Sequence, residues 1–304
     1  MARHKSAIVV DAEYYPLRFL LGSLKTLPPR LSRSAAYALF KTVVGFMPKR
    51  RDLMERQITQ CFPHFSVSKR QEVARRSLLN LAKGLAVYGR IPAMTLPQMS
   101  DVIETEGFEH IAQAFKEKKG MITFTAHYGF WELMAIYVTR LYPDVSMVVR
   151  PLDNPKLDRL VTSVRGSGGG GVIDSRRVLR EGIALLRRNG ILGVLIDQNF
   201  HKGGVFVDFF GRPAATNTLV PILARRTGCA VLPMHNVWRG DKIRIICEPP
   251  VTLSSNPDKN AAIGEDTQRL TRYVERWIRE DPSQWLWLHN RWKRRPLPED
   301  PIFS

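Results

Sequence analysis

The sequence predicts an α/β fold with a mixed or mostly parallel central sheet, flanked by helices and preceded by an amphipathic helical N-terminal portion. Two patterns lead to this prediction. From about residue 120 onward, apolar runs of strand length alternate with segments whose apolar residues have helical spacing. Before that point the pattern is helical and heavily basic. An alternation of strands and helices places helices on the faces of a sheet.

The N-terminal portion contains two apolar segments, 16–27 and 35–47, which Pro28 and Pro29 separate. Charged residues interrupt both, so neither reaches the roughly 18 uninterrupted apolar residues of a membrane-spanning helix. Basic residues flank them, as is typical of helices that lie in a lipid headgroup layer. We therefore expect residues 1–51 to be a membrane-associating amphipathic segment, with ordinary core packing as the alternative.

The remainder is predicted to be one domain, 52–297, followed by a tail, 298–304. Residues 52–118 have a helical pattern, and residues 119–297 have the α/β pattern. Alternation over residues 285–291 suggests one face of a further short strand. The predicted strands are 121–126, 145–149, 171–174, 191–197, 229–237 and 243–247, and the predicted helices are 131–141, 155–165, 176–188, 218–227 and 261–280.

The charge and the cysteines restrict the class of protein. Lys and Arg total 46 against 28 Asp and Glu, a net charge of +18, which favours a polyanionic partner: nucleic acid, an anionic membrane surface or an acidic protein. The three cysteines are odd in number and lack metal-ligand spacing, so we expect them to be core residues in a reducing compartment. The seven histidines are scattered, and no metal is predicted.

The segment 127–132, HYGFWE, is the strongest candidate for chemistry. His127 follows a predicted strand and Glu132 begins a predicted helix, so the two side chains could meet across the corner. A carboxylate on Nδ1 would fix the tautomer of His127 and leave Nε2 free to remove a proton from a hydroxyl. The alternative is that both are surface groups, or that Glu132 makes a capping contact.

Three further segments accompany this corner in order along the chain: 149–155, 197–216 and 285–293. Together the four segments resemble the bacterial lipid A biosynthesis acyltransferase family, which includes lauroyl and myristoyl transferases, within the wider lysophospholipid acyltransferase group. The resemblance runs from about residue 15 to 297. It implies a membrane-associated enzyme that moves a fatty acyl chain from acyl carrier protein or acyl-CoA to a hydroxyl of a lipid, without a further cofactor.

The resemblance also implies roles for individual residues. His127 and Glu132 match the family's H-x4-D/E motif, as general base and orienting acid. The resemblance places the enzyme at the cytoplasmic face of the inner membrane, as a peripheral or monotopic protein. The residues expected to bind substrate are Arg150, through a lipid phosphate, and Asp197, Gln198, Phe209 and Gly211, around the cleft.

Departures from the family pattern leave the acceptor open. Phe130 stands where the family commonly has Asn, and acyltransferases that act on phosphatidylinositol mannosides resemble the same branch. A basic nucleic-acid-binding protein without catalysis is the alternative from another class, although no nucleic-acid motif is present. A hydrolase is disfavoured because no serine occupies a G-x-S-x-G turn.

Overall fold

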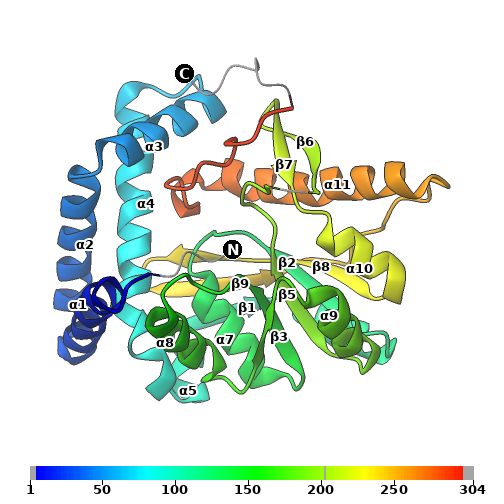
Figure 1. Cartoon of the computed structure of the whole chain (residues 1–304), viewed down its shortest axis with the longest axis horizontal. Helices are drawn as coiled ribbons and strands as arrows, with labels where there is room; N and C mark the ends of the chain where they lie inside the picture. The colour runs from blue at the N-terminus through cyan, green and yellow to red at the C-terminus, as the bar shows by residue number, and fades with distance from the viewer. Residues whose placement is uncertain (1–4, 202, 297–304) are drawn as a thin grey trace.

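A computed structural model describes residues 5–201 and 203–296, and its centre is a seven-stranded sheet in the order β1-β9-β8-β2-β5-β3-β4 (Figure 1). All neighbouring strands are parallel except β8 and β9, which are antiparallel. The predicted α/β fold with a mostly parallel sheet is confirmed. The strands of this sheet are β1 (Ile103–Glu106), β2 (Met121–Thr125), β3 (Val145–Val149), β4 (Gly171–Asp174), β5 (Ile191–Leu195), β8 (Ala230–Arg239) and β9 (Lys242–Cys247).

Helices cover both faces of the sheet. On one face, Ile122 and Phe124 of β2 belong to a core cluster with residues of α9, α10 and α11. On the other, Met121 belongs to a cluster with residues of α5, α6 and α7. All five residues of β2 are buried, as expected for a central parallel strand covered on both sides. These helices are α5 (Leu96–Ser100), α6 (Glu109–Lys116), α7 (Trp131–Leu141), α8 (Pro155–Gly166), α9 (Val178–Arg187), α10 (Leu219–Thr227) and α11 (Lys259–Glu280).

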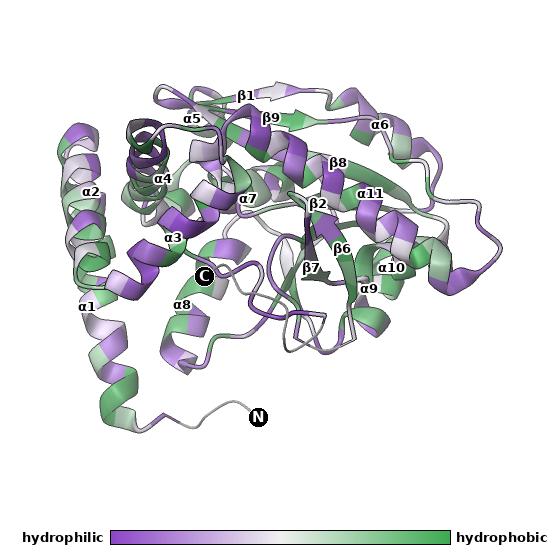
Figure 2. Cartoon of the chain, turned by 90° about the horizontal axis from the view of Figure 1, so that it is seen from above, coloured by the Kyte–Doolittle hydropathy of each residue, from purple (hydrophilic) through white to green (hydrophobic). Residues whose placement is uncertain are grey.

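Four N-terminal helices lie at one edge of the molecule (Figures 1 and 2). The two apolar segments form α1 and α2, and Pro28 caps α2 at the break between them. Among the helices that the structure describes, none is long and apolar enough to cross a membrane. The bounds are α1 (Ala7–Thr26), α2 (Pro29–Gly45), α3 (Pro48–Cys61) and α4 (Val67–Tyr88).

Three parts of the chain differ from the sequence prediction. Strand β1 lies inside the region 52–118 that was expected to be helical, because its four residues pair with β9 at the sheet edge. Residues 205–216 form a separate hairpin, β6 (Val205–Phe209) with β7 (Arg212–Thr216). Residues 285–291 are not a strand: they follow a short 3-10 helix, and only Trp285 makes a bridge, with Tyr128. The tail 298–304 lies outside the described residues.

The three cysteines, Cys61, Cys229 and Cys247, are buried and free, as predicted for core residues. Burial raises the pKa of the Cys247 thiol to about 12. A thiol with such a pKa stays protonated at neutral pH and is a poor nucleophile.

Candidate functional site

His127 and Asp197 come together at the carboxyl edge of the sheet. His127 lies two residues beyond the end of β2, and Asp197 lies two residues beyond the end of β5. These strands are parallel neighbours, with Thr125 opposite Leu195 in the register. Two chains that leave adjacent parallel strands at the same level bring equivalent positions side by side, at the edge where open α/β sheets bind ligands.

The Asp197 carboxylate accepts three hydrogen bonds. Its Oδ1 lies 2.8 Å from His127 Nδ1, and its Oδ2 accepts bonds from the His127 backbone N–H at 3.0 Å and from Trp285 Nε1–H at 2.8 Å. Burial by itself raises the pKa of Asp197, but the charge of His127 and these hydrogen bonds outweigh it and lower the pKa to about 2. An ionised carboxylate on Nδ1 holds the ring proton there and leaves Nε2 as the basic nitrogen.

The Nε2 edge of His127 faces Gln198. The Gln198 amide nitrogen lies 3.2 Å from His127 Nε2, and Gln198 is itself exposed. An amide nitrogen can only donate, so Nε2 accepts, which agrees with a ring proton on Nδ1. Trp131 meets the His127 ring edge-on, with the ring centres 4.9 Å apart. The side chain of His127 is 17% exposed, so Nε2 can be approached once Gln198 moves aside.

Glu132 does not contact Nδ1 of His127, and that part of the expectation is wrong. Its carboxylate forms a bidentate salt bridge with Arg165, in which Nε donates to one oxygen at 2.9 Å and a terminal guanidinium nitrogen donates to the other at 2.5 Å. The reason is geometric: Glu132 lies in the first turn of α7, which packs against α8, and Arg165 lies in the last turn of α8. Burial alone lowers the pKa of Arg165, and the Glu132 carboxylate more than reverses this.

The corner between β2 and α7 is held in place by contacts with Asn236 of β8. Gly129 has φ +63°, and a Cβ there would lie 2.1 Å from the Asn236 carbonyl oxygen, so only glycine fits. The Phe130 backbone N–H donates to the Asn236 side chain at 2.6 Å. The ring of Phe130 points into the core and stacks on Trp238. Phe130 therefore fills the core beneath the corner, and its side chain is not on the open side of the site.

The C-terminal segment lies against this corner. The Leu286 N–H donates to the His127 carbonyl at 3.0 Å. Arg291 is fully buried, and its guanidinium donates to the carbonyls of Ala215 at 2.7 Å and Gln198 at 3.4 Å. Burial lowers the pKa of Arg291 to about 10, against the raising effect of Asp197. Arg291 thus anchors the loop that presents Gln198 to His127.

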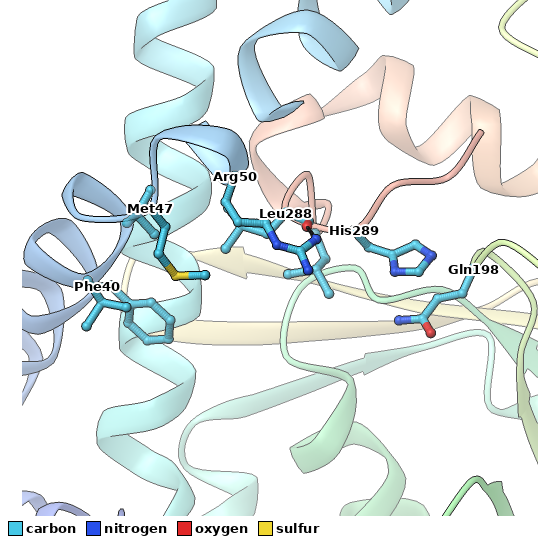
Figure 3. Close-up of a pocket in the computed structure, with 9 residues that line it drawn as sticks. Phe40, Met47, Arg50, Gln198, Leu288 and His289 are labelled. Carbon is cyan, nitrogen blue, oxygen red and sulfur yellow. Dashed lines mark hydrogen bonds between the residues drawn. The ribbon is translucent and has the colours of Figure 1, made fainter. Parts of the chain in front are cut away.

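A groove of about 350 Å³ opens beside Gln198 (Figure 3). Its polar end carries Gln198 and His289, and Phe40 and Met47 lie toward the other end (Figure 3). Its walls come from the end of α2, the start of α3 and the C-terminal segment, so parts of the chain that are far apart in sequence build one mostly apolar space. The lining residues are Phe40, Val43, Val44, Met47, Arg50, Gln198, Leu286, Leu288 and His289.

The other predicted substrate residues lie in different settings. Arg150 is exposed just beyond β3 and forms no hydrogen bond or ion pair with any described residue, so its guanidinium is available. Asp197, expected to line the cleft, is instead buried under His127. Phe209 is fully buried against Trp285 and offers no surface to a substrate. Gly211 lies in the exposed turn of the β6–β7 hairpin.

The sequence interpretation missed three features of the site. They are the salt bridge between Arg165 and Glu132, the hydrogen bond from Trp285 to Asp197, and the burial of Arg291. One available signal was the position of Asp197 at the end of the predicted strand 191–197, comparable to that of His127 directly after the predicted strand 121–126. Within residues 5–201 and 203–296, no group of three His, Cys, Asp or Glu side chains could hold a metal ion.

Comparison with known proteins adds a family. Residues 12–294 match the family described as bacterial lipid A biosynthesis acyltransferase. The chain is 28% identical over 265 residues to a lipid A biosynthesis lauroyltransferase of Escherichia coli, covering 85% of this chain and 84% of that protein. It is 23% identical over 262 residues to a lipid A biosynthesis palmitoleoyltransferase of the same organism, covering 85% and 83%.

A relative with another acceptor is also similar. The chain is 25% identical over 228 residues to a phosphatidylinositol mannoside acyltransferase of Mycolicibacterium smegmatis, covering 73% of this chain and 72% of that protein. The family and these relatives are acyltransferases, so a nucleic-acid-binding protein without catalysis has no support.

Proposed function

Because the chain belongs to the bacterial lipid A biosynthesis acyltransferase family, and is thereby an O-acyltransferase that acts on a lipid, we propose that His127 is its general base. The observation that carries this proposal is the 2.8 Å contact between His127 Nδ1 and Asp197, which leaves Nε2 basic and directed to the open side.

The reaction needs no acyl-enzyme. Nε2 of His127 removes the proton of the acceptor hydroxyl as its oxygen attacks the thioester carbonyl carbon. The tetrahedral intermediate then collapses and releases the thiolate, and Nε2 of His127 donates the proton to that thiolate. Asp197 stabilises the imidazolium that exists between the two proton transfers, and its own pKa, about 2, keeps it ionised throughout.

The two carboxylates have different tasks in this proposal. Asp197 is the positioning residue for His127. Glu132 acts one step away, since its bidentate pair with Arg165 fixes that guanidinium at the first turn of α7. The first residue of the same helix, Trp131, contacts the His127 ring. An arginine held in this way can be directed at a phosphate or carbonyl of a substrate.

For the substrates, we propose a thioester donor, acyl carrier protein or acyl-CoA, and a lipid A precursor-like glycolipid or a phospholipid as acceptor. The groove supports an acyl chain, because its walls are mostly apolar and it ends at Gln198 and His289. Arg150 is a candidate for a substrate phosphate, because it is exposed and unpaired among the described residues.

We place the enzyme on the cytoplasmic face of the cell membrane, held peripherally through α1 and α2. Support comes from exposed apolar side chains on or directly after these helices, including Phe19 of α1 at 77% and Phe46, the residue after α2, at 84% exposed. The basic residues Arg30, Arg50 and Arg51 lie near them in the sequence. Apolar side chains beside basic ones suit an anionic headgroup layer. An acidic carrier protein would be attracted by the same net charge of +18.

The test is transfer of a labelled acyl chain from acyl carrier protein, and separately from acyl-CoA, to a bacterial lipid extract. His127→Ala should lower kcat by on the order of 10²–10⁴-fold, the usual worth of a general base. Glu132→Gln should lower activity less, because it weakens the Arg165 pair but leaves the bond between His127 and Asp197 intact.

His64→Ala is the matched control, since His64 is exposed and, among the aromatic rings of the described residues, contacts Phe62 and Phe65 only. It should transfer acyl chains at the wild-type rate. Undiminished transfer by His127→Ala would refute the proposed mechanism. A larger loss in Glu132→Gln than in His127→Ala would assign the base role elsewhere.

A further inference from the structure

The hydrogen bonds of His289 determine where its ring proton lies. The backbone N–H of Asn199 points at Nε2 of His289, 3.1 Å away. A backbone N–H can only donate, so Nε2 carries a lone pair. Burial lowers the pKa of His289 to about 4, although the nearby Asp197 carboxylate acts in the opposite direction, so the ring is neutral at physiological pH. The single proton of the neutral ring is therefore on Nδ1.

That Nδ1–H donor has no partner within the described part of the chain. The other hydrogen bonds of His289 are made by its backbone: its N–H donates to the Leu286 carbonyl, and its carbonyl accepts from Gln57 at 3.0 Å. The ring lies on the wall of the groove, beside Gln198 (Figure 3). A neutral donor is thus presented at the polar end of an otherwise mostly apolar groove.

The donor is held in place before any substrate arrives. Gln57 is fully buried, and its amide also donates to the Trp287 carbonyl at 2.8 Å, while its Oε1 accepts from the Arg291 N–H at 3.1 Å. Gln57 therefore ties residues 287–291 together from α3. The same polar end holds Gln198, whose amide is 3.2 Å from His127 Nε2, so one side chain, Gln198, stands between the base and the groove that the donor lines.

We propose that His289, through Nδ1–H, donates the hydrogen bond that stabilises the oxyanion formed from the thioester carbonyl. The inference rests on the proposed function, and it makes His289 a catalytic residue of the same reaction. A fixed neutral donor suits this task, because a charge that develops on the carbonyl oxygen in a partly buried site gains most from a preoriented dipole.

The step balances as follows. The acceptor oxygen forms a bond to the carbonyl carbon while its proton passes to His127 Nε2, and the carbonyl π electrons move to the oxygen. That oxyanion accepts the bond from His289 Nδ1–H, without proton transfer. On collapse the C=O bond re-forms, the C–S bond breaks, and the thiolate takes the proton from His127.

Two substitutions distinguish hydrogen-bond donation by Nδ1–H of His289 from a structural role of its Nε2, which accepts from the Asn199 backbone N–H. In His289→Asn the side-chain amide reaches the place of Nδ1 and can donate there, but the acceptor for Asn199 is lost. In His289→Gln the amide oxygen reaches the place of Nε2 and can accept from Asn199, but the donor at Nδ1 is lost. Both variants are assayed for kcat and KM with the acyl donor that the wild-type protein uses, and for their thermal unfolding midpoint.

We expect His289→Gln to lose on the order of 10²–10³-fold in kcat, the measured worth of one oxyanion donor elsewhere, with KM for the donor and the unfolding midpoint close to wild type. His289→Asn should keep kcat within about tenfold of wild type, the factor that corresponds to about 1.4 kcal/mol. The acidic limb of the pH profile, on which activity is lost as the base becomes protonated, should be the same in both variants, because His127 remains the base.

The reverse order, with kcat retained in His289→Gln and lost in His289→Asn, would overturn the inference and leave a purely structural tie to Asn199. A rise in KM without a loss in kcat would also overturn it, since it would mean ground-state binding only. Either result leaves the base role of His127 standing. Absence of acyl transfer by the wild-type protein itself would instead overturn the proposed function, and this inference with it.

Discussion

The carboxylate of Asp197 receives three hydrogen bonds, two of them from His127, and this arrangement fixes both the position and the tautomer of the candidate base. Trp285 supplies the third bond from the C-terminal segment. The side chain of Asp197 is 2% exposed, so almost none of it remains for a substrate. At the scale of single residues, the site is therefore a candidate base paired with a buried acid, and the Gln198 amide lies 3.2 Å from Nε2 of that histidine.

Asp197→Asn is the sharpest residue-scale substitution. An amide at this place can donate to Nδ1, which would move the ring proton to Nε2 and remove the base. We expect kcat to fall by on the order of 10²–10⁴-fold with little change in KM. Steady-state kinetics at neutral pH measure this, with Asp101→Asn, an exposed aspartate at the end of α5, as the control. An active Asp197→Asn enzyme would contradict the positioning role.

The same substitution has a stability signature. Because the folded-state pKa of Asp197 is lowered from 3.8 to about 2, its contribution to stability is present above about pH 4 and is lost as the pH falls toward 2. The difference in urea midpoint between wild type and Asp197→Asn should therefore narrow over that interval. Asp101→Asn, measured over the same pH interval, is the control.

At the scale of elements, α1 and α2 combine two properties. Of the twelve large apolar side chains that are exposed in the described residues, eight lie between residues 8 and 47, so exposure is concentrated on these helices. The end of α2 also supplies one wall of the groove. An acyl chain could in this way pass from a lipid layer into the groove along one helix.

Phe19→Asp tests the membrane role of α1. Phe19 is 77% exposed and does not line the groove. If Phe19 enters the lipid layer on binding, its removal costs about 1.5–3 kcal/mol in transfer free energy. Binding to anionic vesicles should therefore weaken by roughly tenfold or more. Vesicle sedimentation measures the effect.

The matched control is Leu179→Asp. Leu179 is an exposed leucine of α9, at the opposite side of the molecule from α1 (Figure 1), and its replacement changes the charge by the same amount. This variant should bind vesicles like the wild-type protein. Equal weakening in both variants would mean that charge alone decides binding and that the apolar face of α1 has no special role.

At the scale of the whole molecule, the net charge of +18 acts over longer distances than any of these contacts. The excess of Lys and Arg includes the residues that flank α1 and α2. A field of this sign attracts anionic lipids and acidic carrier proteins alike, and it does so without fixing orientation. Orientation must then come from the apolar face of the N-terminal helices.

Binding to vesicles that contain anionic lipid should therefore depend on salt. We expect it to weaken at least tenfold between about 0.1 M and about 1 M NaCl, because the Debye length falls from about 10 Å to about 3 Å. Vesicles of zwitterionic lipid should bind weakly at both concentrations. Salt-independent binding would contradict the electrostatic part of the proposal, and tighter binding to duplex DNA than to anionic vesicles would revive the nucleic-acid alternative.

The sequence by itself determined the main-sheet strands and the helices from β2 onward, the break at Pro28 and Pro29, and the histidine at the end of a central strand. Each depends on local properties: apolar period, proline, and strand length. The sequence could not find β1 or the β6–β7 hairpin, because β1 has only one buried residue out of four and the hairpin lies outside the main sheet.

Only the tertiary structure decided which acid serves His127. Glu132 and Asp197 were both in the predicted site, and Glu132 is nearer in sequence. The choice depends on β5 lying next to β2 in register, and on α8 bringing Arg165 to Glu132. Strand adjacency and helix packing arise from contacts between distant segments, which no local pattern encodes. The sequence therefore specified the proposed base, and the packing of the sheet selected Asp197 as the hydrogen-bond partner of His127.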